Sequence, residues 1–286
     1  MHDGSVASGQ LADGSPWHIH YAVQGNGPDV VLLHGGGPGA TGASNYGRNV
    51  ATLAQHFRCW VIDFPGWGAS SKNLGDWGGA GPFQNGALAL LAFMDAMAIG
   101  RAHLVGNSFG GSAALCLAMS QPERVGRLVL MGPGGGVVPG ATGPTEGIRQ
   151  LLSYYLGEGP TMAKLEAFIQ NLVFDPSQIT PALLRERFEA SLAPDIVARP
   201  PLLPPPPGTP PSPAMFIGQD PRLATLAHEA LFIWGLQDKV NPVEAMQSFR
   251  TMPRADFLLL ARCGHWAQWE QAEKFNAFVT QFLGRP

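Results

Sequence analysis

The sequence predicts an α/β fold in which a mostly parallel central sheet is covered by helices on both faces. Strand-like apolar runs alternate with helix-like segments over residues 16–132, which is typical of parallel strands joined by crossover helices. Residues 145–192 are helix-like throughout, and the strand pattern returns at residues 231–235 and 256–261. A helical lid inserted into one sheet domain accounts for this order.

The individual elements follow from local patterns along the chain. We expect strands at 16–24, 29–34, 58–63, 102–106, 126–132, 231–235 and 256–261, and core helices at 48–56, 83–99, 109–120 and 267–283. Three lid helices, at 145–156, 161–174 and 180–192, each begin with a threonine, whose hydroxyl suits a helix N-cap. The predicted division is a first core part at 1–135, a lid at 136–228 and a second core part at 229–286.

The end of the lid is rich in proline. Eleven of the 28 residues from 194 to 221 are prolines. Proline blocks helix formation and favours an extended polyproline II conformation. The segment is interpreted either as a stiff flap that shapes the entrance to a site or as a disordered surface loop, with equal weight.

Composition limits the classes of partner. The formal net charge is −3, with 14% charged and 45% apolar residues, so no basic surface indicates nucleic-acid binding. The low charge favours a homo-oligomer, a dimer or higher. Three cysteines without a C-x-x-C spacing indicate reduced thiols in a cytoplasmic protein. We expect neither a signal peptide nor a membrane span, because no apolar run approaches 18 residues.

A serine between two glycines is the most informative motif. Gly106-Asn107-Ser108-Phe109-Gly110 joins a strand-like run to a helix-like one, which suits a turn that presents a nucleophilic serine at the edge of a sheet. The following helix would direct its free N–H groups toward a developing oxyanion. Upstream, the strand ending at Leu33 runs into His34-Gly-Gly-Gly-Pro-Gly39. This loop is typical of a second oxyanion-binding N–H, and it lacks the residues of a phosphate loop.

The other members of a catalytic triad follow from chain order, which in this motif class runs serine, acid, histidine. Of the two histidines well downstream of Ser108, only His265 ends a strand-like run, whereas His228 precedes one and is interpreted as a surface residue. Asp238 follows the strand at 231–235 in a short loop. The acidic candidates are Asp175, Asp195, Asp220, Asp238 and Asp256. Asp256 precedes its strand and would emerge at the wrong edge, so Asp238 is preferred, with a plain turn or helix-cap residue as the alternative.

The combined motifs resemble those of the meta-cleavage product hydrolases, which are α/β-hydrolases that cleave a carbon–carbon bond in ring-opened catechols. The similarity spans nearly the whole chain but lapses in the proline-rich segment. It is carried by His34-Gly-Gly-Gly-Pro-Gly-Ala40, Ser44-Asn45-Tyr46-x-Arg48-Asn49, Gly106-Asn107-Ser108-x-Gly110-Gly111, Leu130-Met131-Gly132-Pro133-Gly134-Gly135 and Cys263-Gly-His265-Trp266-Ala-Gln-Trp269-Glu270.

The resemblance implies a role for each predicted site residue. Ser108 would be the nucleophile, His265 the base and Asp238 its orienting partner. The backbone N–H groups of Gly36 and Phe109 would form the oxyanion hole. The residues that would hold the dienoate are Asn45, Asn107, Arg187 and Trp266. A guanidinium suits this task because the substrate carries a carboxylate.

The resemblance also implies the reaction. The dienol of a 2-hydroxy-6-oxohexa-2,4-dienoate would first become a ketone, and cleavage would then give a 2-hydroxypenta-2,4-dienoate and a carboxylic acid. The substituent at carbon 6 is expected to be aryl or steroid-derived, as in the biphenyl, dibenzofuran and steroid pathways. No metal or organic cofactor is expected, because no His/Cys/carboxylate cluster has metal-ligand spacing. The alternatives are a carboxylesterase of the same fold and, more remotely, a non-catalytic ligand-binding protein.

Overall fold

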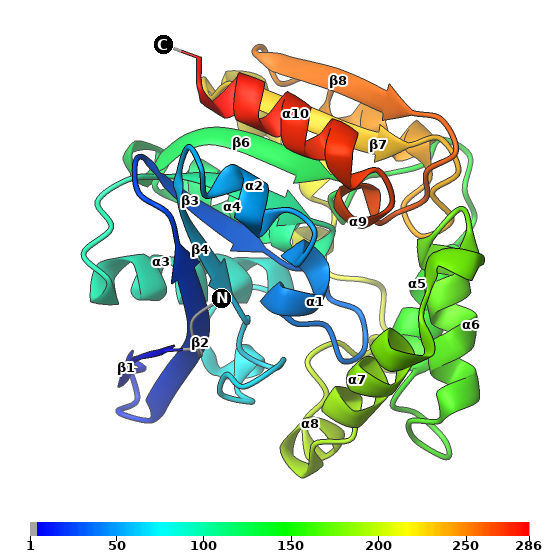
Figure 1. The fold of residues 1–286 in the computed structure, drawn as a ribbon. Helices are drawn as coiled ribbons and strands as arrows, with labels where there is room; N and C mark the ends of the chain where they lie inside the picture. The colour runs from blue at the N-terminus through cyan, green and yellow to red at the C-terminus, as the bar shows by residue number, and fades with distance from the viewer. Residues whose placement is uncertain (1–4, 286) are drawn as a thin grey trace.

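The computed structural model describes residues 5–285, which form an eight-stranded sheet and a group of helices beyond one edge of it (Figure 1). The strands are β1 (Ser5–Gln10), β2 (Pro16–Gln24), β3 (Asp29–Leu33), β4 (Arg58–Ile62), β5 (Ala102–Asn107), β6 (Val125–Met131), β7 (Ala230–Gly235) and β8 (Ala255–Leu260). Their order is β1-β2-β4-β3-β5-β6-β7-β8. The first two pairs are antiparallel and the rest are parallel, so the predicted fold class is confirmed.

Helices cover both faces of the sheet. The core helices are α1 (Gly42–Tyr46), α2 (Val50–Leu53), α3 (Pro82–Ala96), α4 (Phe109–Ser120), α9 (Ala267–Glu270) and α10 (Ala272–Leu283). Side chains of α3 and α4 form one apolar cluster with the sheet, and those of α2 and α10 form a second. Two separate clusters place one layer of helices on each face, as Figure 1 shows.

The lid helices lie on the side toward which the parallel strands point (Figure 1). They are α5 (Glu146–Ser153), α6 (Met162–Leu172), α7 (Pro181–Ser191) and α8 (Pro194–Ala198). The predicted threonine caps are confirmed, since Thr145, Thr161 and Thr180 accept N–H bonds from residues three positions on. A third apolar cluster joins the lid to Trp266 of the core. This contact fixes the lid above the carboxyl edge of the sheet.

Three local predictions were wrong. Strand β1 was not anticipated because Ala7 is its one buried residue and its short side chains give no alternation; pairing with β2 makes it extended. The helix expected at 48–56 is replaced by α1 and α2, because Thr41 and Ser44 form a capping box that starts α1 earlier. The helix expected at 267–283 is broken at Gln271, whose backbone leaves the helical region.

The proline-rich segment is packed at both ends and exposed between them. After α8, the chain runs without regular structure until a series of 3₁₀ turns, the first at Pro213–Met215. Leu202 and Met215 pack against the main core cluster, whereas residues 205–213 are exposed. Within residues 5–285, no helix combines the length and apolar character needed to cross a bilayer.

Candidate active site

Ser108 occupies a tight turn between β5 and α4. Its backbone has φ +50° and ψ −112°. Residues other than glycine rarely adopt this conformation, and where they do, they are often at functional sites. A Cβ on Gly106 would lie 2.5 Å from the backbone nitrogen of Gly111, and one on Gly110 would lie 2.4 Å from the carbonyl oxygen of Leu33. The two glycines are therefore needed for the turn to pass this close to neighbouring backbone.

His265 and Asp238 meet at the ends of adjacent parallel strands. Asp238 follows β7, His265 follows β8, and the His265 Nδ1 lies 2.7 Å from the Asp238 Oδ2. Both side chains are almost fully buried. The other carboxylate oxygen of Asp238 accepts the backbone N–H groups of Val240 and Asn241, each at 2.8 Å. Asp238 is thus both a turn-capping residue and a partner of His265, and the two interpretations of it are compatible.

The loops that carry Ser108 and His265 are joined directly. The side-chain Nδ2 of Asn107 donates to the carbonyl oxygen of His265 at 3.1 Å and to that of Met131 at 3.3 Å. Gly132, at the end of β6, has φ +44°, and a Cβ there would lie 3.1 Å from the His265 Nδ1. The structure therefore brings the predicted serine, histidine and aspartate loops together at the carboxyl edge of the sheet, whereas Asp256 is exposed on β8.

Two backbone N–H groups at this edge have no acceptor among the described residues. Gly36 lies in the loop after β3, Phe109 is the first residue of α4, and neither N–H forms a hydrogen bond within residues 5–285. A Cβ on Gly36 would lie 3.3 Å from the Cβ of Phe109, so the two peptide groups are close. Unused N–H groups at a helix N-terminus are what a developing oxyanion requires.

His34 fixes the glycine-rich loop from behind. Its Nδ1 donates to the Gly35 carbonyl at 2.8 Å, and its Nε2 accepts the N–H of Phe64 at 2.9 Å. This pattern needs the neutral ring. Burial lowers the pKa of His34, because desolvation disfavours the imidazolium. The loop is therefore held by a histidine that stays neutral at physiological pH.

Arg187 projects from the lid helix α7 into the same region. It is 2% exposed, and its Nε and Nη2 donate to the Pro38 carbonyl at 3.1 and 2.8 Å. No ion pair joins it to a carboxylate within residues 5–285. Burial lowers the pKa of Arg187 to about 10, which leaves the group charged at neutral pH. Its guanidinium carbon lies 5.2 Å from the Trp266 ring centroid.

Asn45 and Trp266 are bonded to each other. The Trp266 Nε1 donates to the Asn45 Oδ1 at 3.0 Å, and the Asn45 Nδ2 donates to the Thr41 carbonyl at 3.0 Å. Both polar atoms of Asn45 are thus already engaged within the protein, as is the amide nitrogen of Asn107. In this structure the two asparagines act as supports for the site walls, while Arg187 remains as the charged group.

Two residues at the site were not singled out from the sequence. A Cβ on Gly36 would lie 2.7 Å from the Leu202 Cδ1, so a leucine of the proline-rich segment lies directly over the glycine-rich loop. Glu270 accepts N–H bonds from Gly264 at 2.8 Å and from Phe174 at 2.6 Å. Glu270 stands in a quoted motif, but its spacing from His265 indicated no chemistry. For Leu202 no sequence signal was present.

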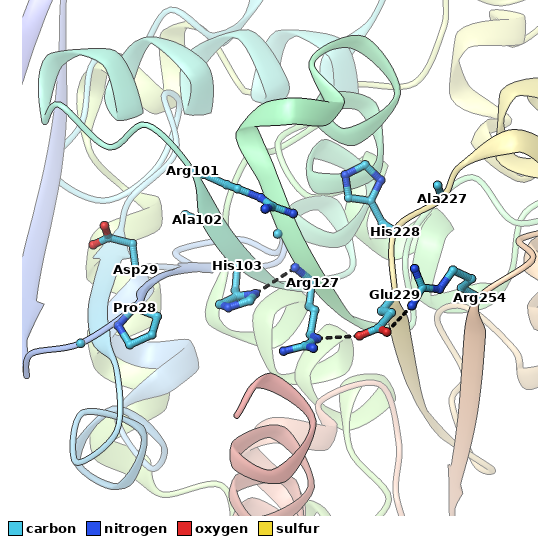
Figure 2. Close-up of a pocket in the computed structure, with 12 residues that line it drawn as sticks. Pro28, Asp29, Arg101, Ala102, His103, Arg127, Ala227, His228, Glu229 and Arg254 are labelled. Atoms are coloured by element: carbon cyan, nitrogen blue, oxygen red, sulfur yellow. Dashed lines mark hydrogen bonds and ion pairs between the residues drawn. The ribbon is translucent and has the colours of Figure 1, made fainter. Parts of the chain in front are cut away.

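A cavity of about 680 Å³ lies at the opposite, amino-terminal edge of the sheet (Figure 2). Most of its polar groups have partners in the protein: Arg127 and Arg254 both bind Glu229, and the Arg101 Nε and His228 Nε2 contact backbone carbonyls. None of the predicted site residues lines this cavity. Among the residues described, no group of three metal-binding side chains was found.

Comparisons with known proteins agree with the fold. A family model described as alpha/beta hydrolase fold matches residues 29–272. The chain is 41% identical over 279 residues to a 2-hydroxy-6-oxononadienedioate/2-hydroxy-6-oxononatrienedioate hydrolase of Burkholderia vietnamiensis, covering 96% of this chain and 94% of that one. A relative of the same name from Escherichia coli is 38% identical over 277 residues, covering 96% and 93%.

Solved structures give the same result. A meta-cleavage product hydrolase from Pseudomonas fluorescens superposes with a TM-score of 0.81 at 29% identity, covering 98% of this chain and 97% of that one. A 2-hydroxy-6-oxo-6-phenylhexa-2,4-dienoate hydrolase from a Rhodococcus species superposes with a TM-score of 0.77 at 26% identity, covering 99% and 100%. The similarity therefore includes the lid and extends over the full sheet.

Proposed function

Since the chain belongs to the meta-cleavage product hydrolases of the α/β-hydrolase-fold family, we propose that it hydrolyses a carbon–carbon bond in a ring-opened catechol. The substrate is a 2-hydroxy-6-oxohexa-2,4-dienoate. The products are a 2-hydroxypenta-2,4-dienoate and the carboxylic acid that carries the substituent at carbon 6.

The observation that carries the proposal is the buried charge of Arg187. A guanidinium removed from water loses solvation free energy, which an anion restores only if it comes within hydrogen-bond reach. Carbonyl contact with Pro38 compensates in part, but within residues 5–285 no carboxylate pairs with the group. The carboxylate of a dienoate would complete this site, whereas a neutral ester would leave it unpaired.

The triad, the oxyanion-hole N–H groups, Arg187 and Trp266 then each have a part in the reaction. Arg187 binds the carboxylate end, and enclosure beside Trp266 holds the dienol while it becomes the ketone, so that the leaving carbon departs as a stabilised carbanion. His265, held by Asp238, removes a proton from Ser108 or from water, and the resulting oxygen attacks the carbonyl at carbon 6. The N–H groups of Gly36 and Phe109 stabilise the oxyanion. Water supplies the hydroxyl of the acid and the proton of the dienoate.

We infer that the group at carbon 6 is uncharged, aryl or steroid-derived. Of the lysines and arginines in residues 5–285, Arg187 is the one that is buried. The curated relatives are named for dienedioate substrates, which carry a second carboxylate. In the described site, such a carboxylate would find no further buried cation. Leu202 lies over Gly36, next to the carbonyl that carries this group, and it presents an apolar surface to it.

The remaining inferences concern the cell and the assembly. The described cysteines, Cys59, Cys116 and Cys263, are free and buried, which is consistent with a cytoplasmic protein. Leu259 at the sheet edge and Phe278 on α10 are 43% and 40% exposed, and their burial would favour a homo-oligomer. Sedimentation analysis tests this, since a monomer at micromolar concentration would contradict it.

The test of the proposed function is turnover of a panel of ring-fission products, which are yellow and lose colour when cleaved. The panel should contain the 6-phenyl dienoate, a 6-alkyl dienoate and a dienedioate with a second carboxylate. We expect turnover of the monocarboxylates, with the phenyl compound preferred to the dienedioate. If no member of the panel is cleaved, the proposed reaction is contradicted. A preference for the dienedioate would contradict the inference that the group at carbon 6 is uncharged.

A further inference from the structure

A short segment of the lid lies against the loop that carries His265. The carbonyl oxygen of Leu172, the last residue of α6, accepts the backbone N–H of His265 at 2.7 Å. A Cβ on Gly264 would lie 2.7 Å from that oxygen and 2.9 Å from the nitrogen of Phe174. The lid backbone therefore approaches the histidine loop as closely as a glycine allows.

The carboxylate of Glu270 bridges the two segments. Its Oε2 accepts the N–H of Phe174 in the lid at 2.6 Å, and its Oε1 accepts the N–H of Gly264 in the histidine loop at 2.8 Å. Burial raises the pKa of Glu270, and the N–H groups of Phe174, Gly264 and Trp266 act in the opposite direction. Hydrogen bonds to a charged acceptor are about twice as strong as neutral ones.

A second set of contacts joins the histidine loop to the core. The Gln237 side chain accepts the N–H of Cys263 at 3.1 Å, and the Gln237 N–H donates to the Cys263 carbonyl at 3.0 Å. Gln237 thus joins the histidine loop to the loop of Asp238. Glu270 joins it to the lid, and the two attachments are made at Cys263 and Gly264, the residues immediately before His265.

We propose that Glu270 is a positioning residue whose carboxylate couples the lid segment 172–174 to the loop of His265, so that the placement of the lid sets the orientation of the catalytic histidine. The inference rests on the proposed role of His265 as the base. Arg187 lies on α7, which follows this segment in the chain. The segment that contacts His265 and the helix that carries Arg187 therefore belong to the same lid. A small shift of a catalytic group costs large factors in rate, which gives the coupling a kinetic consequence.

The first test replaces the carboxylate without changing its shape. Glu270→Gln puts an amide N–H₂ against one of the backbone N–H donors, so one of the two bonds is lost. We expect kcat to fall by roughly tenfold to a hundredfold on both a 6-phenyl dienoate and a small neutral ester. The KM for the dienoate should change little, because Arg187 is intact. The downfield proton resonance of the His265–Asp238 hydrogen bond should shift or disappear. Glu273→Gln, an exposed residue of α10, is the matched control and should behave as wild type.

The second test acts from the lid and leaves Glu270 in place. Phe174→Pro removes the N–H that Glu270 accepts, and the preceding residue, Val173, already has the extended conformation that proline requires of it (φ −121°, ψ 154°). Phe174→Ala retains the N–H and is the control. We expect the proline variant to lose kcat as Glu270→Gln does, and the alanine variant to keep it.

Two outcomes would overturn the proposal. A lower melting temperature with unchanged kcat in both variants would make Glu270 a stabilising group only. A raised KM for the dienoate with unchanged ester turnover would mean that Glu270 acts on the lid alone. Ester turnover and the labelling rate of Ser108 by a fluorophosphonate report on His265 even if the dienoates are not substrates, so failure of the proposed function is distinguishable from failure of this inference.

Discussion

The side-chain Nδ2 of Asn107 lies 3.1 Å from the carbonyl oxygen of His265, so the residue before the predicted nucleophile holds the loop of the predicted base. This bond crosses from β5 to the loop after β8, which β6 and β7 separate in the sheet. The loops of Ser108 and His265 are thereby joined by a hydrogen bond from the side chain of Asn107 to the backbone of His265. The lid adds to this alignment through the contacts of Leu172 and Glu270.

Removal of the nucleophile should abolish turnover without abolishing binding. We expect Ser108→Ala to lose at least roughly a thousandfold in kcat, because the hydroxyl is absent while Arg187 still holds the dienoate. Rapid mixing of the variant with a yellow ring-fission product should show a bound, uncleaved chromophore. Turnover near that of wild type would remove the assignment of Ser108.

Loss of the charge of Asp238 should leave the fold intact and slow catalysis. In Asp238→Asn, His265 would lose the partner of its Nδ1 proton, with an expected decrease in kcat of about three to four orders of magnitude. Asp256→Asn is the matched control, because Asp256 is exposed on β8 and pairs only with Arg285 among the described residues. The assignment fails if the Asp256 variant is the damaged one.

The cysteines should be unreactive in the native protein. Burial raises the pKa of Cys59 and Cys116 to about 12 and raises that of Cys263 further. The thiolate is the reactive form, and a raised pKa moves its appearance to a higher pH. We expect an aromatic disulfide reagent at pH 8 to label no thiol in native protein and all of them after denaturation. Rapid labelling of the native form would contradict the burial.

Leu202 should influence which substituent the site accepts. Leu202 covers Gly36, whose N–H is proposed to bind the oxygen of the carbonyl at carbon 6. The substituent on that carbon should therefore lie beside Leu202. Leu202→Ala should raise kcat/KM for a bulky bicyclic substituent relative to phenyl by roughly tenfold. Leu203→Ala is the control, since that side chain is 48% exposed. Equal specificity in the two variants would show that Leu202 does not contact the group.

The strand order and the motif spacing were enough to predict the sheet and to place the loops of Ser108, Asp238 and His265 at its carboxyl edge. Each of these residues follows a strand, and parallel strands end at one edge, so one-dimensional order determines where they lie. The same reasoning placed Asp256 at the opposite edge, and the structure shows it exposed there. The lid helices were also predictable, because threonine caps mark their starts.

Contacts between distant segments were not predictable in this way. The pairing of Asn45 with Trp266 joins residues 221 positions apart, and nothing local in either segment indicates it. The bridge from Glu270 to Phe174 and the position of Leu202 over Gly36 depend on how the lid folds back. Strand β1 was missed for a related reason, since its extended form comes from its partner β2 and not from its own pattern.

The most direct measurement of the central claim is paired kinetics of Arg187→Ala on a ring-fission dienoate and on a small neutral ester. A charge-assisted bidentate pair contributes about 1.5–3 kcal/mol, and the ester has no carboxylate with which to form it. Arg185→Ala, an exposed arginine on the same helix, serves as the control and should resemble wild type. We expect Arg187→Ala to lower kcat/KM on the dienoate by roughly tenfold to a few hundredfold, in kcat as well as KM, and barely to alter ester hydrolysis. Equal losses on both substrates would mean that Arg187 only supports the lid, and would contradict its role as the carboxylate clamp of a carbon–carbon hydrolase.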